Sequence, residues 1–159
     1  MKEKVWYVDG ACSGNPGAGG WACVEVKINQ VHGEPQLDLF QMTGGKAKTT
    51  NNEMELTAFY QALLESYKTK TEQVTVHSDS AYVVNAIDKG WLMNWYANGW
   101  KTVEGKPVKN RNIWEKVYKL VYRKGMAVRV KKVYGHKGDM LNEYADRLAV
   151  YAKEAQKEE

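Results

Sequence analysis

The sequence is poor in the residues on which several classes of protein depend. It has 159 residues but only two cysteines, three prolines and three histidines, and it contains no internal repeat or low-complexity segment. The cysteines, Cys12 and Cys23, follow no metal-ligand spacing, which argues against a zinc-binding module. No apolar run approaches the roughly 18 residues of a membrane-spanning helix, so no membrane span is predicted.

A signal peptide is not recognisable at the start of the chain. Residues 1–4 are mostly charged and lead directly into a predicted strand. We therefore expect a cytoplasmic protein whose thiols are reduced. The length of the chain and the lack of a linker predict a single domain over residues 1–159.

Charge is unevenly distributed, although the net charge of the chain is only +4. Residues 1–89 contain eight lysines and no arginine against eleven acidic residues, whereas residues 90–159 contain fifteen basic residues against eight acidic ones. An acidic half and a basic half are typical of a protein that binds cations in one region and phosphate groups in another. A solvated basic surface is the alternative explanation.

The first candidate carboxylate follows a short apolar strand. Residues 5–8 are β-branched or aromatic, which predicts a buried strand, and Asp9 comes directly after them. Asp9-Gly10 is also a common turn pair, so a purely structural role is the alternative. The glycines that follow lead into an alternating strand pattern and include no Gly-Lys-Ser/Thr, which indicates a wide hairpin and not a phosphate-binding loop.

The hydrophobic pattern predicts the other elements of an α/β protein. Further strands are expected at about residues 21–28, 37–43 (ended by Gly44-Gly45), 74–79 and 128–133. Helices are expected at about residues 51–67, 80–87, 112–123 and 142–157, with a shorter one within 91–111. This order predicts a five-stranded mixed sheet, with three antiparallel strands plus two parallel ones, and helices on its faces.

A second carboxylate lies on the predicted helix at residues 51–67. Glu55 shares a helical face with Ala58 and Ala62, whose small side chains should lie against the sheet. A buried carboxylate requires a cation, because an unpaired buried charge is costly. Glu53 points about 200° away, toward solvent or substrate.

Two more carboxylates lie where they should approach Asp9. Asp79 ends a predicted strand, although it could also cap the next helix. Asp146 lies on the last helix, where an ion pair with Arg147 or Lys153 is the alternative. Four convergent carboxylates without a cysteine or histidine cluster predict a site for Mg²⁺, which prefers oxygen ligands. Two such ions about 3.5–4 Å apart can clamp the attacking and leaving oxygens of a phosphoryl displacement.

Residues 91–111 combine tryptophans with basic side chains. This composition is typical of surfaces that stack on bases and contact phosphates, although the tryptophans could instead pack a short helix onto the core. His136 follows the last predicted strand, in a loop that contains two glycines, Gly135 and Gly138. It is a candidate functional histidine, although it could be an ordinary loop residue.

Four motifs of the sequence resemble type 1 ribonuclease H in order and spacing. They are Asp9-Gly-Ala-Cys-Ser-Gly-Asn-Pro-Gly, Thr-Thr-Asn-Asn-Glu-Met-Glu55-Leu, His-Ser-Asp79-Ser, and Gly-His136 with Asn142-Glu-x-x-Asp146. The resemblance to this bacterial-type ribonuclease HI family covers nearly the whole chain. It implies the ribonuclease H-like fold and an endonuclease that hydrolyses the RNA strand of RNA–DNA hybrids by a two-metal-ion mechanism, leaving 5′-phosphate and 3′-hydroxyl ends.

The resemblance also implies roles for individual residues. Asp9, Glu55, Asp79 and Asp146 would bind two Mg²⁺ ions, with Mn²⁺ as the alternative ion, and His136 would assist proton transfer or product release. Contacts to the RNA strand are implied for Cys12, Asn15 and Asn52. Contacts to the DNA strand are implied for Thr50 and Asn51. The protruding substrate-binding handle, at about residues 91–111, would contribute Asn94, Trp95, Trp100 and Lys101.

The chain departs from strongly basic members of the family in its handle. Tyr96-Ala97-Asn98 stands where those members carry a run of lysine and arginine. No separate hybrid-binding domain is recognised, and we expect a monomer. The competing functions are a junction resolvase or transposase core, the ribonuclease H domain of a reverse transcriptase, and an inactive hybrid-binding module, which would lack one of the carboxylates.

Overall fold

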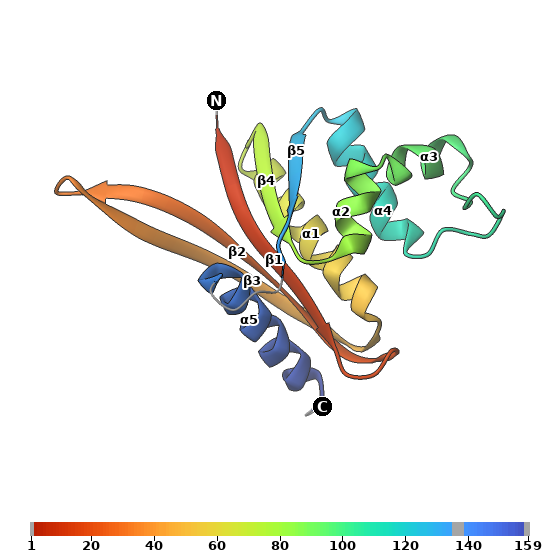
Figure 1. Cartoon of the computed structure of the whole chain (residues 1–159), viewed down its shortest axis with the longest axis horizontal. Helices are drawn as coiled ribbons and strands as arrows, with labels where there is room; N and C mark the ends of the chain where they lie inside the picture. Colours follow the sequence, from red (N-terminus) through yellow and green to blue (C-terminus); the bar gives the residue numbers. More distant parts are fainter. Residues whose placement is uncertain (1, 135–138, 158–159) are drawn as a thin grey trace.

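The first three strands form an antiparallel meander whose outer part projects from the body of the molecule (Figure 1). The computed structural model describes residues 2–134 and 139–157. Its meander consists of β1 (Glu3–Cys12), β2 (Gly17–Val31) and β3 (Glu34–Thr49). The predicted hairpin between the first two strands is confirmed by their antiparallel pairing.

The third strand is longer than predicted. Gly44 and Gly45 were expected to end it, but β3 continues to Thr49, and Gly44 pairs with Trp21 of β2. The prediction was wrong because the glycines serve packing here. A Cβ atom on Gly44 would lie 2.6 Å from the ring of Trp21, so a glycine leaves room for the indole on the sheet.

Two parallel strands complete the sheet. β4 (Gln73–Ser78) pairs with β1, and β5 (Ala127–Lys132) pairs with β4, both in parallel. The strand order is β3-β2-β1-β4-β5, which confirms the predicted mixed sheet of five strands. Pairing of β1 with β4 ends at Tyr7 and His77, close to Asp9 and Asp79. Asp79 follows β4, but Asp9 lies within β1, which continues to Cys12, so Asp9-Gly10 is not a turn.

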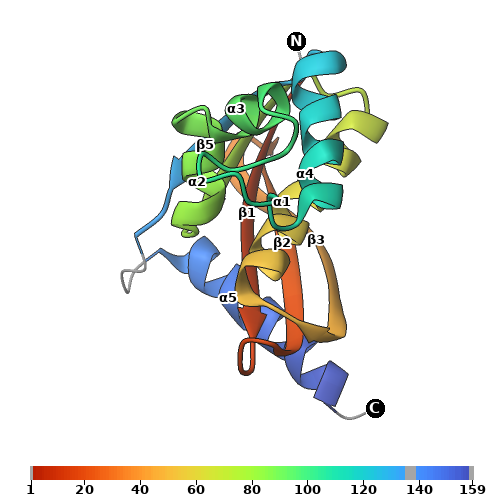
Figure 2. The same ribbon diagram turned by 90° about the vertical axis from the view of Figure 1, so that its right-hand side faces the viewer.

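Helices cover both faces of the sheet (Figures 1 and 2). One face is covered by α5 (Met140–Lys157), which packs across the three antiparallel strands. The helices of the other face are α1 (Asn51–Lys68), α2 (Ala81–Asp88), α3 (Trp91–Ala97) and α4 (Arg111–Tyr118). The helix predicted over residues 112–123 is observed as α4 followed directly by a π-helical turn, η1 (Lys119–Arg123). Among the described residues, no helix has both the length and the apolar composition of a membrane span.

The core lies between α1 and the sheet. Trp6 and Val8 of β1 are fully buried, as are Leu56 and Phe59 of α1. Each such side chain contributes roughly 1.5–3 kcal/mol relative to an exposed position. The indole N–H of Trp6 donates to Ser66 Oγ at 2.8 Å, so this large ring is buried without an unpaired polar atom.

Candidate active site

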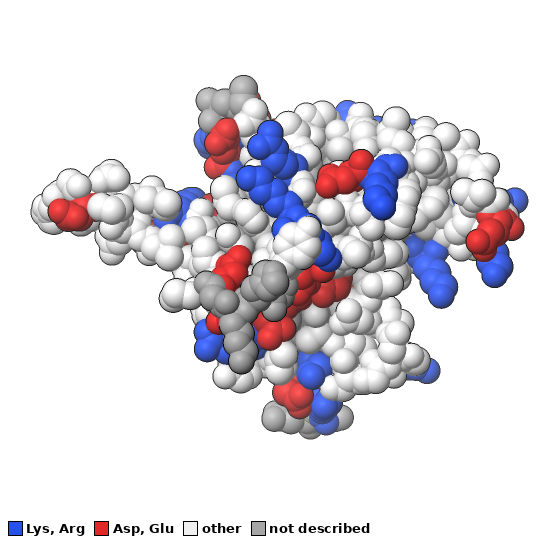
Figure 3. Space-filling view, viewed as in Figure 1, with Lys and Arg blue, Asp and Glu red and all other residues white. Residues whose placement is uncertain are grey.

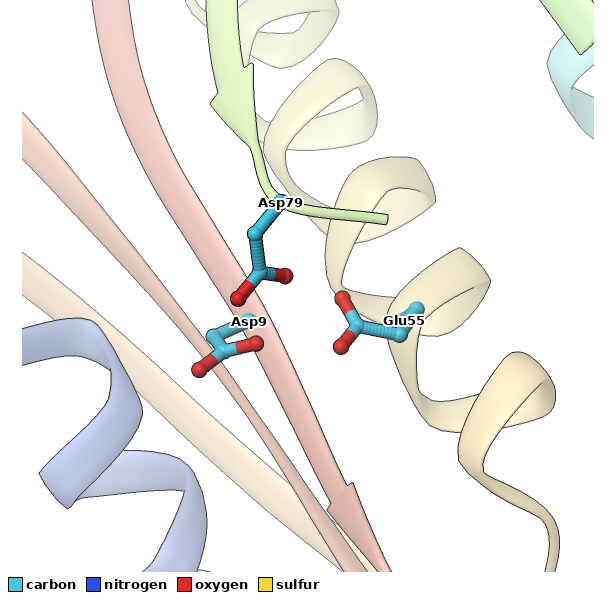
Figure 4. Close-up of side chains that lie close together, drawn as sticks. All are labelled: Asp9, Glu55 and Asp79. Atoms are coloured by element: carbon cyan, nitrogen blue, oxygen red, sulfur yellow. The ribbon is translucent and has the colours of Figure 1, made fainter. Parts of the chain in front are cut away.

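Three of the four predicted carboxylates converge at the end of the central strands (Figure 4). One oxygen atom from each of Asp9, Glu55 and Asp79 lies within 4.8 Å of the others. Asp9 comes from β1, Glu55 from α1, and Asp79 from the segment after β4. Asp9 and Glu55 are almost completely buried, with 2% and 5% of their surfaces exposed. Asp79 is partly exposed, so the cluster is open on one side.

A glycine brings α1 close enough to place Glu55 beside Asp9. A Cβ atom on Gly10 would lie 2.5 Å from the backbone nitrogen of Glu55 and 2.6 Å from the carbonyl carbon of Met54. No other residue type fits at this contact without a shift of the helix. The backbone N–H of Gly10 also donates to Asp9 Oδ1 at 2.9 Å, which fixes that carboxylate.

The start of α1 sets the direction of Glu55. The side chain of Thr50 accepts a hydrogen bond from the backbone N–H of Glu53 and caps the helix. Glu53 bonds to Thr49 and to Lys46, whose Nζ lies 2.9 Å from Glu53 Oε2. The two glutamates therefore point to different surroundings, and only Glu55 joins the cluster.

The carboxylate of Asp79 is not used to cap α2. Ser80 caps that helix, because its Oγ accepts from the backbone N–H of Val83 at 3.2 Å. The backbone N–H of Ser80 donates to Ser78 Oγ at 3.1 Å, and the ammonium of Lys132 donates to the backbone oxygen of Asp79. The segment is therefore held from both sides while the carboxylate faces Asp9 and Glu55 (Figure 4).

The cluster carries more negative charge than its surroundings can stabilise. Burial raises the pKa of both Asp9 and Glu55 above their ordinary values, and the charges of neighbouring carboxylates raise both further. Burial also raises the pKa of Asp79, although the ammonium of Lys132 opposes this effect. Within residues 2–134 and 139–157, no lysine, arginine or histidine forms an ion pair with these three carboxylates.

The donor set fits a divalent cation. Glu55 Oε2 is buried and has no hydrogen-bond partner among the described residues, although a buried oxygen normally has one. An all-oxygen set of carboxylates is the type of site that Mg²⁺ or Mn²⁺ occupies. A cation here would stabilise the ionised form of all three carboxylates.

Asp146 flanks the cluster and does not join the three close oxygens. It is exposed on α5, and its negative charge contributes to the raised pKa of Glu55 and of Asp79. The helix is brought close by Gly20, where a Cβ atom would lie 2.5 Å from the carbonyl oxygen of Ala149. The alternative ion pairs of Asp146 do not form among the described residues, and Lys153 pairs with Glu154 instead.

Lys132 is a residue of the site that the sequence analysis missed. It ends β5, directly beside Ser78 of the parallel strand β4. Carboxyl ends of adjacent parallel strands meet at one edge of a sheet, and this rule could have connected Lys132 with Asp79. Figure 3 shows acidic side chains at the centre of this face, beside a column of basic side chains that follows β5. His136 lies outside the described residues.

The residues predicted to contact the two nucleic-acid strands gather at the start of α1. Asn15 Oδ1 accepts from the backbone N–H of Asn51 at 3.1 Å, and Cys12 Sγ lies 3.3 Å from the carbonyl oxygen of Thr49. The turn between β1 and β2 is thereby held against the helix N-terminus. Thr50 is occupied as the helix cap, whereas Asn52 is exposed on the first turn.

The handle residues divide into two groups. Asn94, Trp95 and Lys101 line a surface cavity of about 360 Å³. Trp100 does not line it. Its side chain is only 8% exposed, and its ring contacts Tyr96 edge-on. Trp100 therefore packs against the core, which was the alternative to a role in substrate binding.

Comparison with known proteins agrees with the geometry. The model of the RNase H family matches residues 1–154. The ribonuclease H of Syntrophomonas wolfei subsp. wolfei is 46% identical over 149 residues, which cover 94% of each chain. LC9-RNase H1, a type 1 RNase H with the type 2 active-site motif, has a TM-score of 0.83 at 29% identity, over 98% of this chain and 74% of that one.

A more distant structure shares the fold alone. The foamy viral protease-reverse transcriptase in complex with an RNA/DNA hybrid has a TM-score of 0.79 at 19% identity, over 96% of this chain and 20% of that one. The mixed sheet and the acidic cluster at the ends of its central strands are those of an α/β nuclease. The chain belongs to the ribonuclease H family, as its motifs indicated.

Proposed function

We propose that this protein hydrolyses the RNA strand of RNA–DNA hybrids at the cluster of Asp9, Glu55 and Asp79. The observation that carries the proposal is the convergence of three carboxylates within 4.8 Å, two of them buried and none with a basic ion-pair partner among the described residues. Relatives named ribonuclease H and a neighbour of the same fold in complex with an RNA/DNA hybrid support this substrate.

The cofactor of the proposed reaction is Mg²⁺, with Mn²⁺ as the alternative. Asp9, Glu55 and Asp79 would hold the ions, and Asp146 would add a fourth carboxylate from α5. When bound, two divalent ions lower the pKa of an attacking water and neutralise charge on the leaving oxygen, which leaves 5′-phosphate and 3′-hydroxyl ends.

The residues of the chain supply position and charge. Lys132 fixes the backbone of Asp79 and favours the ionised form of its carboxylate. Gly10 keeps Glu55 beside Asp9 through the close backbone contact. We assign His136 to proton transfer at the leaving 3′-oxygen or to product release, because a near-neutral pKa suits either role.

The substrate would lie across the start of α1 and the handle. Cys12, Asn15 and Asn52 would contact the RNA strand, where the 2′-hydroxyl distinguishes RNA from DNA. Thr50 and Asn51 would contact the DNA strand, because a helix N-terminus favours phosphate. The handle would contribute Asn94, Trp95, Trp100 and Lys101. We propose that the protein acts as a cytoplasmic monomer with one domain over residues 1–159.

The test is incubation with an RNA–DNA hybrid, duplex RNA and duplex DNA, each with Mg²⁺ and with EDTA. We expect cleavage of the RNA in the hybrid with Mg²⁺ only. Cleavage in EDTA, or cleavage of duplex DNA, would contradict the proposal. Tight binding of the hybrid without any cleavage would identify an inactive binding module instead.

A further inference from the structure

A second cavity combines aromatic rings with basic side chains away from the carboxylate cluster. It has a volume of about 450 Å³ and lies between the end of α3, α4 and the π-helical turn η1. None of Asp9, Glu55 and Asp79 lines it. Its main lining residues are Tyr96, Trp100, Arg111, Tyr118, Lys119 and Arg123.

Tyr96, Trp100 and Tyr118 line the cavity, and together with Tyr122, which lies outside its lining, they form a continuous aromatic group with open surface. Tyr96 stacks on Tyr118 with 4.1 Å between ring centroids and 13° between planes. Tyr118 also contacts Tyr122, with 4.9 Å between centroids, and Trp100 meets Tyr118 edge-on at 6.4 Å. Tyr96 is 42% exposed and Tyr122 is 39% exposed, so both outer rings offer surface to a ligand.

The basic side chains around these rings are available for an anion. Lys119 and Arg123 are exposed, and neither forms an ion pair with an acidic residue among those the structure describes. Arg123 Nη2 donates to the hydroxyl of Tyr96 at 3.2 Å, which places a guanidinium at the edge of the aromatic group. The acidic residue of the cavity, Glu115, is already paired with Arg111.

The backbone of η1 is itself unusual. Residues Lys119–Arg123 form a π-helical turn that follows α4 directly and ends this helical segment. Single π-helical turns are rare and are frequently found at functional sites. Lys119 and Arg123 of this turn line the cavity, so the uncommon backbone and the basic side of the cavity coincide.

We propose that this cavity binds an unpaired nucleotide of single-stranded nucleic acid. The base would stack on the open ring surface of Tyr96, and the adjoining phosphate would lie between Lys119 and Arg123. Stacking on aromatic side chains with basic groups beside them is how proteins hold single strands without reading their sequence. An acidic peptide would use the basic groups but would leave the exposed rings without a partner. The proposal does not depend on hydrolysis at the carboxylates.

The composition of the handle fits this role. Tyr96-Ala97-Asn98 offers a ring for stacking and contains no basic side chain. The larger cavity of about 800 Å³ at the far end of α1 offers a contrast. It contains Lys68 and Lys70 but only one aromatic ring, that of Tyr67.

The test compares binding of a short oligothymidylate with binding of an abasic oligomer of the same length, in EDTA. A single stacked base should make the protein bind oligothymidylate about tenfold more tightly. In Tyr96→Leu this preference should disappear, and melting temperature checks that the variant is folded. Equal binding of both oligomers by the original protein would overturn the proposal, because charge alone would then explain the affinity.

Two further measurements locate the site. Oligothymidylate should shift the backbone amide signals of residues 118–123 in a nuclear magnetic resonance spectrum of the unmodified protein. The double variant Lys119→Ala/Arg123→Ala should lose about tenfold in affinity for oligothymidylate, since each lost phosphate contact weakens binding. The matched control, Lys68→Ala/Lys70→Ala, makes the same change in net charge and should lose much less. Unchanged amide signals at residues 118–123, or equal losses in both double variants, would contradict the assignment.

Discussion

Gly10 and Glu55 are in backbone contact so close that a Cβ atom on Gly10 would lie 2.5 Å from the Glu55 nitrogen. This contact joins the end of β1 to the first turns of α1 and thereby sets Glu55 beside Asp9. The position of the carboxylate cluster therefore depends on a residue that has no side chain.

Gly10→Ala should impair both stability and activity. The added methyl group must push α1 away from β1, and overpacking of this kind typically costs about 1–3 kcal/mol. Because the shift moves Glu55, the rate of hybrid cleavage with Mg²⁺ should fall by at least tenfold. Urea unfolding and cleavage rates measure the two effects.

A glycine in the turn between β2 and β3 provides the control for Gly10→Ala. Gly33 has a φ of +80°, and a Cβ atom there would meet nothing within 4 Å. Gly33→Ala should therefore cost roughly 1–2 kcal/mol through backbone strain alone and leave the cleavage rate unchanged. If Gly10→Ala also left the rate unchanged, the contact would not position the site.

Glu55→Gln and Glu53→Gln should have opposite effects. Glu55→Gln removes a buried ligand, so cleavage with Mg²⁺ should collapse while the melting temperature in EDTA stays equal or rises, because one of the repelling charges is gone. Glu53→Gln should keep the cleavage rate and lower the melting temperature slightly, because hydrogen bonds from Thr49 and Lys46 favour its charged form. Loss of cleavage in Glu53→Gln alone would mean that the catalytic glutamate is misassigned.

Without metal, the contribution of the clustered carboxylates to the free energy of unfolding should fall as the pH rises. The folded state raises the pKa of Asp9, Glu55 and Asp79, so it binds protons that the unfolded chain has released above the ordinary carboxyl pKa of about 4. Their contribution to the free energy of unfolding is complete below that pH and is lost as the pH rises through the raised values.

Thermal unfolding in EDTA across this pH range measures the contribution. Asp9→Asn should show a smaller fall in melting temperature with rising pH than the original protein. Saturating Mg²⁺ should reduce the fall in the original protein, because the metal replaces the protons. Identical pH profiles for both proteins in EDTA would contradict the raised pKa of Asp9.

Lys132→Gln should shift the pH dependence of cleavage. Without the ammonium beside it, Asp79 should have a still higher pKa, so the acidic limb of the pH–rate profile should move to higher pH. Lys131→Gln is the matched control, because Lys131 is the exposed neighbour on the same strand and faces the other side. A shift of equal size in both variants would indicate a general charge effect.

The order of the strands and helices could be predicted from the sequence, and so could the choice of Glu55 over Glu53 as the glutamate of the cluster. Alternating and helical periodicities are local properties, so the meander and the inward face of Glu55 with Ala58 could be predicted without knowledge of the fold. The Thr50 cap was predictable for the same reason.

Features that depend on contacts between distant segments could not be predicted in this way. The extension of β3 through Gly44 depends on the ring of Trp21, and the burial of Trp100 depends on the tyrosines around it. Lys132 was missed because its partner, the backbone oxygen of Asp79, is 53 residues away in the chain. The position of Asp146 beside the cluster depends on how α5 packs against Gly20.

The most direct test of the proposed function is cleavage of an RNA–DNA hybrid by three proteins with Mg²⁺. The original protein and Asp38→Asn, which alters an exposed carboxylate of β3, should cut the RNA strand at similar rates. Asp9→Asn should bind the hybrid but show almost no cleavage, because the central carboxylate of the cluster is lost. Cleavage by Asp9→Asn at the rate of the original protein would contradict catalysis at this site.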